Sequence, residues 1–333
     1  MNKITIIGLG LTGNSIGLGL KQSAGPDVRI TGFDPDGTLE QVALRKYLSV
    51  HEIAPDLERA VRGASLVVIS TPISAAREVL EAIAPFLDRG ATVTDTLPLK
   101  EPVLAISRAV LGPDTSFIGG HPFSLTVDLD VVNGGVPSAD LFAGAPWCIM
   151  PAPGAGNAAL NTVINLVETL GAKPLFIDPL EHDSFLAAVS HLPVAVSAAF
   201  IKAVAGSPAW GDMSALAHGR FRAVSEGVAY DPQTLADTLS QNSALLLRWL
   251  DGYMNALYDL RTLIAGGDID ALAATLTEAN QARRAWADPD VADADDARLR
   301  SELRDAINDS RPSQSLMGTY LTEKIFRRKE RGG

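Results

Sequence analysis

A glycine-rich turn directly after a short apolar segment is the feature that most constrains the fold. Residues 3–8 are mostly apolar and lead into Gly8-Leu9-Gly10-Leu11-Thr12-Gly13, and a helical pattern follows at residues 14–21. In such a turn the first glycine permits a tight bend, the second lets backbone approach a pyrophosphate, and the third lets helix and strand pack closely. The order strand, turn, helix predicts a dinucleotide site, with the phosphates at the helix N-terminus. Since glycines also mark turns for steric reasons alone, a sheet without a nucleotide is the alternative.

The end of the second apolar segment selects the cofactor. Residues 28–34 end in the carboxylate of Asp34, about 20 residues beyond the turn. A carboxylate at this place accepts hydrogen bonds from the ribose hydroxyls of NAD and repels the 2′-phosphate of NADP. No arginine follows in residues 35–37 to hold such a phosphate. We therefore expect NAD and consider NADP the less favoured cofactor.

Apolar strands alternate with helices through the first half of the chain. This alternation is typical of a parallel sheet covered by helices on both faces. The further strands that we expect are residues 66–70, 91–95, 116–119, 145–150 and 172–178, with helices at 74–86 and 155–170. The predicted fold class is α/β, with a Rossmann-type parallel-sheet domain at residues 1–178.

The second half of the chain has helical periodicity only. We expect helices at residues 181–205, 234–264 and 268–286. They predict an all-α domain at residues 179–287, which follows the sheet domain and serves substrate binding and dimerisation. Residues 288–333 are expected to be a linker, acidic at its start, and a tail whose basic end is solvated.

Composition and charge exclude several classes of protein. A net charge of −11 disfavours nucleic acid and anionic membrane surfaces as partners. The single cysteine, Cys148, forms no internal disulfide and belongs to no zinc motif, and the irregular histidine spacings predict no metal site. With no signal-peptide pattern at the start, we expect a cytoplasmic protein. Residues 185–204 are apolar enough to resemble a membrane span, but His191, Pro193 and Lys202 interrupt them, which favours a core helix.

Several motifs resemble those of the prephenate and arogenate dehydrogenase family. They occur in the expected order over roughly residues 4–286: Phe117–Pro122 (FIGGHP), Leu141–Pro151 (LFAGAPWCIMP), Glu181–Asp183 (EHD), Ala187–Pro193 (AAVSHLP), Tyr230–Pro232 (YDP) and Asn242. The resemblance implies hydride transfer from a cyclohexadienol to NAD, with loss of carbon dioxide to form an aromatic ring, as in tyrosine synthesis. It also implies pairing of two helical domains in a homodimer.

The resemblance assigns roles to individual residues. His121 would take the proton of the substrate hydroxyl, since a histidine titrates near the working pH; a turn-capping role is its structural alternative. His191 is open between a substrate contact and a structural role, and His182-Asp183 is interpreted as a helix cap. The residues that we expect to complete the cofactor site are Ser70, Thr71, Pro72 and Thr96.

Departures from the family pattern fall at positions that face the substrate. The family has a serine, a histidine and an arginine where this chain has Pro98, Val194 and Glu226. Proline offers no hydroxyl, and a glutamate in place of an arginine would repel a carboxylate. Ser124 (or Thr96) and Arg222 (or Arg220) are candidate replacements for the lost hydroxyl and the lost cation.

The departures leave three hypotheses open. The first is prephenate or arogenate dehydrogenation, and the second is a related enzyme that accepts a different cyclic alcohol. The third is a regulator that binds the nucleotide without catalysis. Measured turnover of a cyclic alcohol would separate both enzymes from the regulator.

Overall fold

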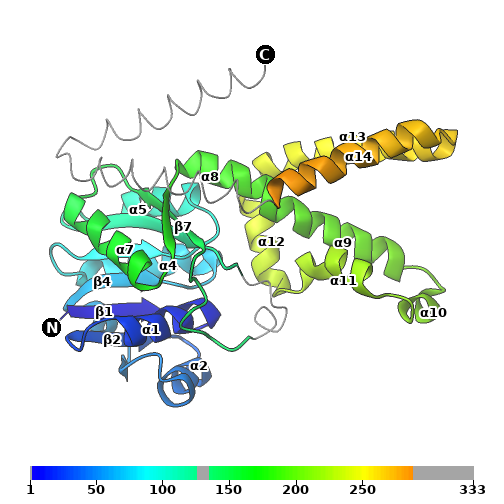
Figure 1. Ribbon diagram of the computed structural model, residues 1–333. Helices are drawn as coiled ribbons and strands as arrows, with labels where there is room; N and C mark the ends of the chain where they lie inside the picture. The colour runs from blue at the N-terminus through cyan, green and yellow to red at the C-terminus, as the bar shows by residue number, and fades with distance from the viewer. Residues whose placement is uncertain (1, 126–134, 288–333) are drawn as a thin grey trace. The chain divides into compact units, whose positions relative to one another are not determined.

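The computed structural model describes residues 2–125 and 135–287 (Figure 1). By its internal contacts the chain forms two compact units, residues 1–250 and residues 251–333. The two units divide at residue 250, beyond the domain boundary predicted after Asp178. The chain changes from strands to helices at Asp178, and the domain boundary there stays a prediction. The expected linker and basic tail lie outside the described residues.

An eight-stranded sheet forms the core of the first unit. Its strand order is β3-β2-β1-β4-β5-β6-β7-β8. The strands are β1 (Asn2–Ile7), β2 (Val28–Phe33), β3 (Glu52–Ile53), β4 (Ala64–Ile69), β5 (Thr92–Asp95), β6 (Ser116–Pro122), β7 (Pro146–Pro151) and β8 (Lys173–Phe176). All seven expected strands are present, and the two-residue β3 is the additional one. The order reverses at β1, so the loops after β1 and β4 leave in opposite directions and open a crevice between them.

One strand pairing contradicts the expectation of an all-parallel sheet. β6 and β7 pair antiparallel, with His121 opposite Cys148, whereas every other neighbouring pair is parallel. A buried strand has the same apolar pattern in either direction, so the pattern could not reveal this reversal.

Helices cover both faces of the sheet. Successive side chains of a strand point to opposite faces, and both faces carry apolar side chains that need cover. In β1, Ile6 belongs to one buried cluster and Ile7 to the other. Ile6 packs with residues of α1 (Leu11–Ser23) and α7 (Asn157–Thr169), while Ile7 packs with residues of α4 (Ala76–Ile83) and α5 (Glu101–Val110). The shorter elements of this region are α2 (Gly37–Gln41), a π-helix (Val42–Tyr47), α3 (Leu57–Val61) and 3₁₀ turns at Ile73–Ala75 and Ala84–Phe86.

The chain beyond β8 is helical, as predicted, with more breaks than the periodicity indicated. Its elements are α8 (Pro179–Leu186), a π-helix (Ala187–His191), α9 (Leu192–Ala205), α10 (Trp210–Ser214), α11 (Gly219–Ser225), a 3₁₀ turn (Glu226–Val228), α12 (Pro232–Gln241), α13 (Ser243–Gly266) and α14 (Ile269–Trp286). The helix predicted over residues 234–264 is two helices separated at Asn242. Asn242 leaves the helical conformation, and its side chain bonds residues of α8 and the π-helix instead.

The continuous helical run Pro179–Ala205 is long and apolar enough to cross a membrane by length and composition. Only 22% of its most apolar window is buried, so within one chain it is not the core helix that the sequence predicted. Leu180, Phe185 and Val189 are 58%, 43% and 70% exposed. Length and composition are weak grounds for a membrane span, and His182 and His191 of the same run are buried in polar contacts. Its exposed apolar side chains indicate a surface that another element covers.

Replacement of Gly13 by alanine tests the packing of α1 on β1. A Cβ atom on residue 13 would lie 1.9 Å from the carbonyl oxygen of Gly8, so the helix must move. We expect Gly13→Ala to lower the free energy of unfolding by about 1–3 kcal/mol, measured by urea denaturation. Gly10→Ala is the matched control, because nothing lies within 4 Å of a Cβ there. Equal stability of the two variants would contradict the close contact.

Candidate active site

The predicted cofactor residues gather at one edge of the sheet, where β1, β4 and β5 end side by side. Gly8 has φ +96°, and a Cβ on it would lie 2.3 Å from the carbonyl oxygen of Ser70. Ser70 in turn donates its backbone N–H to Ile7, and the hydroxyl of Thr96 donates to that of Ser70 at 3.1 Å. The loops after the three strands therefore form one surface.

This surface fits a dinucleotide by three observations. A Cβ on Gly10 would meet nothing within 4 Å, so the backbone is open to a bulky group there. The first turn of α1 has neither a side-chain cap nor an acidic residue, which leaves its positive end for an anion. The hydroxyl of Thr71 is buried without a hydrogen-bond partner among the described residues.

Asp34 joins the glycine turn to the end of β2. Its carboxylate accepts the backbone N–H of Leu9 at 2.7 Å and that of Asp36 at 2.9 Å. The side chain is thus fixed beside the turn, at the place where a ribose would lie in a dinucleotide bound at this crevice.

A buried ion pair holds the strand that carries His121. The side chains of Lys100 and Asp95 form the pair, and both are 0% exposed. At Gly120, Asp95 accepts the backbone N–H at 2.9 Å and Lys100 donates to the backbone carbonyl oxygen at 2.6 Å. A Cβ on residue 120 would lie 2.4 Å from the carbonyl oxygen of Asp95, so only glycine fits there. Burial lowers the pKa of Lys100, and Asp95 opposes that shift.

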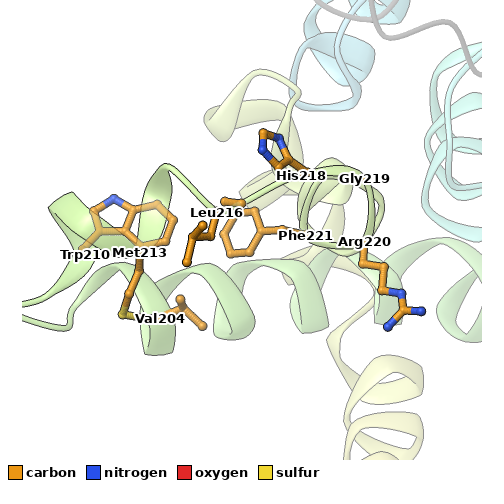
Figure 2. A pocket seen from close by; sticks show the side chains of 9 residues that line it. Val204, Trp210, Met213, Leu216, His218, Gly219, Arg220 and Phe221 are labelled. Carbon is orange, nitrogen blue, oxygen red and sulfur yellow. The ribbon is translucent and has the colours of Figure 1, made fainter.

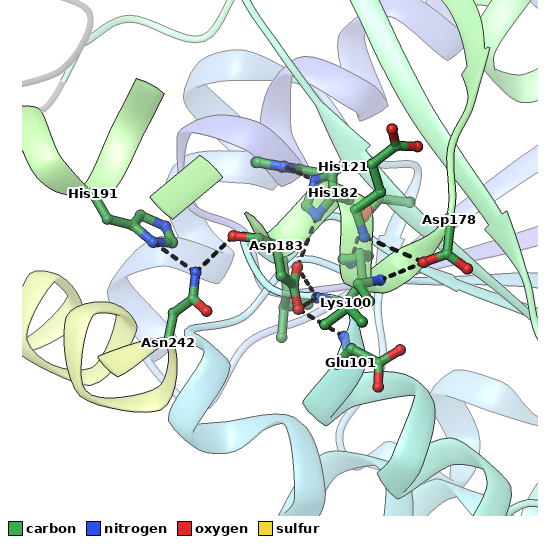
Figure 3. A network of polar contacts seen from close by, with 12 residues as sticks. Lys100, Glu101, His121, Asp178, His182, Asp183, His191 and Asn242 are labelled. Carbon is green, nitrogen blue, oxygen red and sulfur yellow. Dashed lines mark hydrogen bonds and ion pairs between the residues drawn. The ribbon is translucent and has the colours of Figure 1, made fainter. Parts of the chain in front are cut away.

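His121 lies at the end of β6 and contacts a second histidine (Figure 3). Its Nδ1 is 3.0 Å from Nε2 of His182, whose Nδ1 is 2.8 Å from Oδ1 of Asp183. The ring of Phe123 lies 4.6 Å from that of His121. Burial lowers the pKa of His121 well below its usual value, and the neighbouring His182, Lys100 and His191 lower it further. His121 is therefore a neutral base at neutral pH.

The contacts of His182 and Asp183 contradict their interpretation as a helix cap. The cap of α8 is Asp178, which accepts the N–H groups of Leu180 and Glu181. One turn later His182 and Asp183 are buried and turned toward β6 and α5. Two ionisable residues inside an apolar helix were the signal in the sequence, because such a pair is seldom buried without polar partners.

His191 is buried at the end of the π-helix. Its Nδ1 is 3.0 Å from the amide nitrogen of Asn242, which also donates to the carbonyl oxygen of Asp183 at 2.9 Å. Its Nε2 is buried with no partner among the described residues. Burial lowers the pKa of His191 to about 4. The ring is thus a neutral group with one nitrogen left for a ligand.

The positions that depart from the family pattern are spread over several elements. Pro98 is half-buried in the loop after β5, and Val194 is half-buried on α9. Oε1 of Glu226 is buried without a hydrogen-bond partner in the described part of the chain, and this carboxylate adds to the effect of burial in raising the pKa of Tyr230. Arg222 is exposed on α11 and forms no ion pair within residues 2–125 and 135–287. Of the predicted substrate residues, His191 is joined to Asp183 through the side-chain amide of Asn242.

An apolar hollow of about 460 Å³ lies apart from these residues, against α9, α10 and α11 (Figure 2). Its lining includes Val204, Trp210, Leu216 and Phe221, and Leu216 is 83% exposed. No group of three or more potential metal ligands occurs within the described residues. The lining is mainly apolar and also includes His218 and Arg220, so one of the two candidate cations, Arg220, lies at this hollow.

A dinucleotide turn and a partly buried, neutral histidine at the same sheet edge are the features of a nucleotide-dependent oxidoreductase. Comparison with known families agrees: residues 16–175 match the nucleotide-binding domain of prephenate dehydrogenase, and residues 178–278 match its dimerization domain. The chain belongs to the prephenate dehydrogenase family. The family, the α/β fold class with its helical second part and the oxidoreductase class, all predicted from the sequence, are confirmed.

Individual relatives agree with this assignment. The cyclohexadienyl dehydrogenase of Zymomonas mobilis is 29% identical over 286 residues, which cover 85% of this chain and 95% of that protein. Prephenate dehydrogenase from A. aeolicus, solved with hydroxyphenyl propionate and NAD+, is 25% identical with a TM-score of 0.76 and covers 85% of this chain and 98% of its own. Synechocystis arogenate dehydrogenase is 29% identical with a TM-score of 0.68, over 85% and 99% of the two chains.

Replacement of Lys100 by methionine tests the ion pair beneath His121. The variant would leave the carboxylate of Asp95 buried without its counter-charge. We expect Lys100→Met to lower the free energy of unfolding by about 3–5 kcal/mol in urea denaturation. Arg29→Met is the matched control, because Arg29 and Glu52 form a solvent-exposed pair whose loss should cost far less stability. Similar losses in the two variants would mean that the buried pair does not hold the site.

Proposed function

We propose that this protein oxidises a cyclohexadienol of the prephenate or arogenate type with NAD, and that loss of carbon dioxide yields an aromatic ring. The observation that carries the proposal is the neutral, partly buried His121 at the sheet edge that bears the dinucleotide turn. The names of the Zymomonas, A. aeolicus and Synechocystis relatives support the substrate class. Tyrosine synthesis is the pathway that such a reaction serves.

The cofactor residues that we propose lie along the crevice after β1. The turn Gly8–Gly13 and the N-terminus of α1 would hold the pyrophosphate, and Asp34 the ribose. Ser70, Thr71, Pro72 and Thr96 would line the nicotinamide end, where the hydroxyl of Thr71 lacks a partner among the described residues. When bound, NAD supplies the acceptor for a hydride.

In the proposed reaction, the protein's own residues hold the substrate ring and accept one proton. Nε2 of His121 would accept the proton of the substrate hydroxyl, since its Nδ1 faces His182. Desolvation and the neighbouring His182 and Lys100 lower the pKa of His121, which keeps this base neutral. Formation of the aromatic ring drives the loss of carbon dioxide, so we assign no residue to that step.

The residues proposed for the substrate side of the site also suggest a second candidate substrate. We assign Ser124, His191 and Arg222 to the substrate, with the free Nε2 of His191 as the donor that a ligand would meet. Oε1 of Glu226, which has no hydrogen-bond partner among the described residues, instead favours a different cyclic alcohol that carries a cationic group. Pro98 and Val194, which lack the family's polar side chains, agree with an altered substrate.

We further propose that the enzyme is a cytoplasmic homodimer that pairs through its helical region. Leu247, Met254 and Tyr258 of α13 are spaced by seven and four residues and are 55%, 52% and 66% exposed. This spacing places them on one face of the helix. Leu216 beside the apolar hollow and Leu276 of α14, 83% and 55% exposed, add further apolar surface to the region that matches the dimerization domain.

The proposed reaction predicts NADH formation when the purified protein is mixed with NAD and prephenate or arogenate. We expect His121→Asn to lower kcat/KM by a factor on the order of 10²–10⁴ without loss of NAD binding in calorimetry. A base must be neutral to act, and burial holds the pKa of His121 below 6.5, so kcat/KM should stay level from pH 8 to 6.5 and fall only in more acidic buffer. His51→Asn, at an exposed histidine of another edge, should behave as the wild type. Full activity of His121→Asn would refute its role.

The dimer is tested by charge on the face of α13. We expect the double variant Met254→Glu, Tyr258→Glu to elute as a monomer in size-exclusion chromatography with light scattering, because burial of two carboxylates at an interface is costly. Asn255→Glu, one residue along the helix and also exposed, should stay a dimer. A monomeric wild type, or a dimeric double variant, would contradict this interface.

A further inference from the structure

We propose that His182 and Asp183 are positioning residues that determine which nitrogen of His121 carries the proton. The three side chains form a line in which Asp183 contacts His182 and His182 contacts His121 (Figure 3). The proposal rests on the proposed function, in which His121 is the base, and it adds how the chain makes that base ready.

The hydrogen bonds along this line run in one direction, because a carboxylate only accepts hydrogen bonds. Oδ1 of Asp183 lies 2.8 Å from Nδ1 of His182, so that nitrogen carries the hydrogen. In the neutral ring Nε2 of His182 is then an acceptor. It lies 3.0 Å from Nδ1 of His121, which must therefore be the donor. The remaining nitrogen of His121, Nε2, is left with a free electron pair.

Asp183 is held in place by the start of α5. Its carboxylate accepts the backbone N–H of Lys100 at 2.9 Å and that of Glu101 at 2.9 Å. The helix has no cap from its own N-terminal residue, so Asp183 supplies the missing acceptor from another element. These bonds place the side chain of Asp183 at the positive end of the helix dipole. Lys100 thus joins the line to the ion pair beneath Gly120.

The line explains how His121 keeps its orientation with Pro98 at the family's serine position. Proline has no hydroxyl to bond the ring of His121. Nδ1 of His121 instead contacts His182, whose side chain is 2% exposed. The orientation of His121 therefore comes from α8, and not from the loop after β5.

The proton balance of the step is simple. The O–H bond of the substrate hydroxyl breaks, and an N–H bond forms at Nε2 of His121. The hydrogen on the hydroxyl-bearing carbon leaves with its electron pair to the nicotinamide of NAD, which is reduced, while the alcohol carbon is oxidised to a carbonyl. The imidazolium that forms keeps its Nδ1–H bond to His182, and Asp183 stays ionised.

Substitution of Asp183 by asparagine inverts the line. An amide can donate to Nδ1 of His182, which moves the hydrogen of that ring to Nε2 and forces Nδ1 of His121 to accept. Nε2 of His121 then carries the hydrogen and is no base. We expect kcat to fall by a factor on the order of 10²–10⁴ while KM changes less than threefold.

A pair of variants at His182 separates this role from packing. Gln carries an acceptor near the place of Nε2, so His182→Gln should retain at least tenfold more kcat than His182→Leu, which has none. Both remove the imidazole, so a merely structural role would affect them alike. Equal kcat values in the two variants, or an Asp183→Asn variant within threefold of the wild type, would overturn the proposal.

The protonated nitrogen is read directly by ¹⁵N NMR of protein labelled at its five histidines, with signals assigned by substitution. Without substrate, Nδ1 of His121 should carry the hydrogen in the wild type and Nε2 should carry it in Asp183→Asn. The hydrogen on Nε2 in the wild type would overturn the proposal. Because this measurement needs no turnover, it tests the line even if prephenate and arogenate are not oxidised, and that failure would count against the proposed function alone.

Discussion

The ion pair of Lys100 with Asp95 is the interaction on which the site depends. The pair is buried, and both of its side chains bond to the backbone of Gly120. These bonds fix the strand that carries His121. The backbone N–H of the same lysine helps to hold Asp183, which orients His182. A buried pair is retained only where its polar atoms are satisfied, and here each also fixes a part of the site.

The two ends of the site differ in how well they follow the family. The cofactor end keeps the glycine turn, Asp34 and the open backbone at Gly10. The positions that we propose for the substrate end carry Pro98, Val194 and Glu226, where the sequence resemblance implies a serine, a histidine and an arginine. Hydride transfer needs the same cofactor whatever the alcohol, so the proposed cofactor residues would serve any of the proposed substrates.

The exposed apolar surface of the helical region fits the same picture. A helical run from Pro179 to Ala205 that is mostly unburied within one chain needs a cover. Its His182 and Asp183 contact the sheet region and build the site, while Leu180, Phe185 and Val189 of the same run are exposed. The proposed dimer would therefore enclose the element that orients the base.

The sequence by itself determined the seven main strands, the dinucleotide turn, the place of His121 and the change from strands to helices, because apolar period and glycine spacing are local properties. It could not give the direction of β7, the break at Asn242 or the part played by His182 and Asp183. Those features depend on partners far apart in the chain: Asp183 meets Lys100 across 83 residues, and Asn242 meets His191 across 51. Such contacts depend on the tertiary structure, because a buried polar side chain needs a hydrogen-bond partner and the fold sets which groups lie beside it.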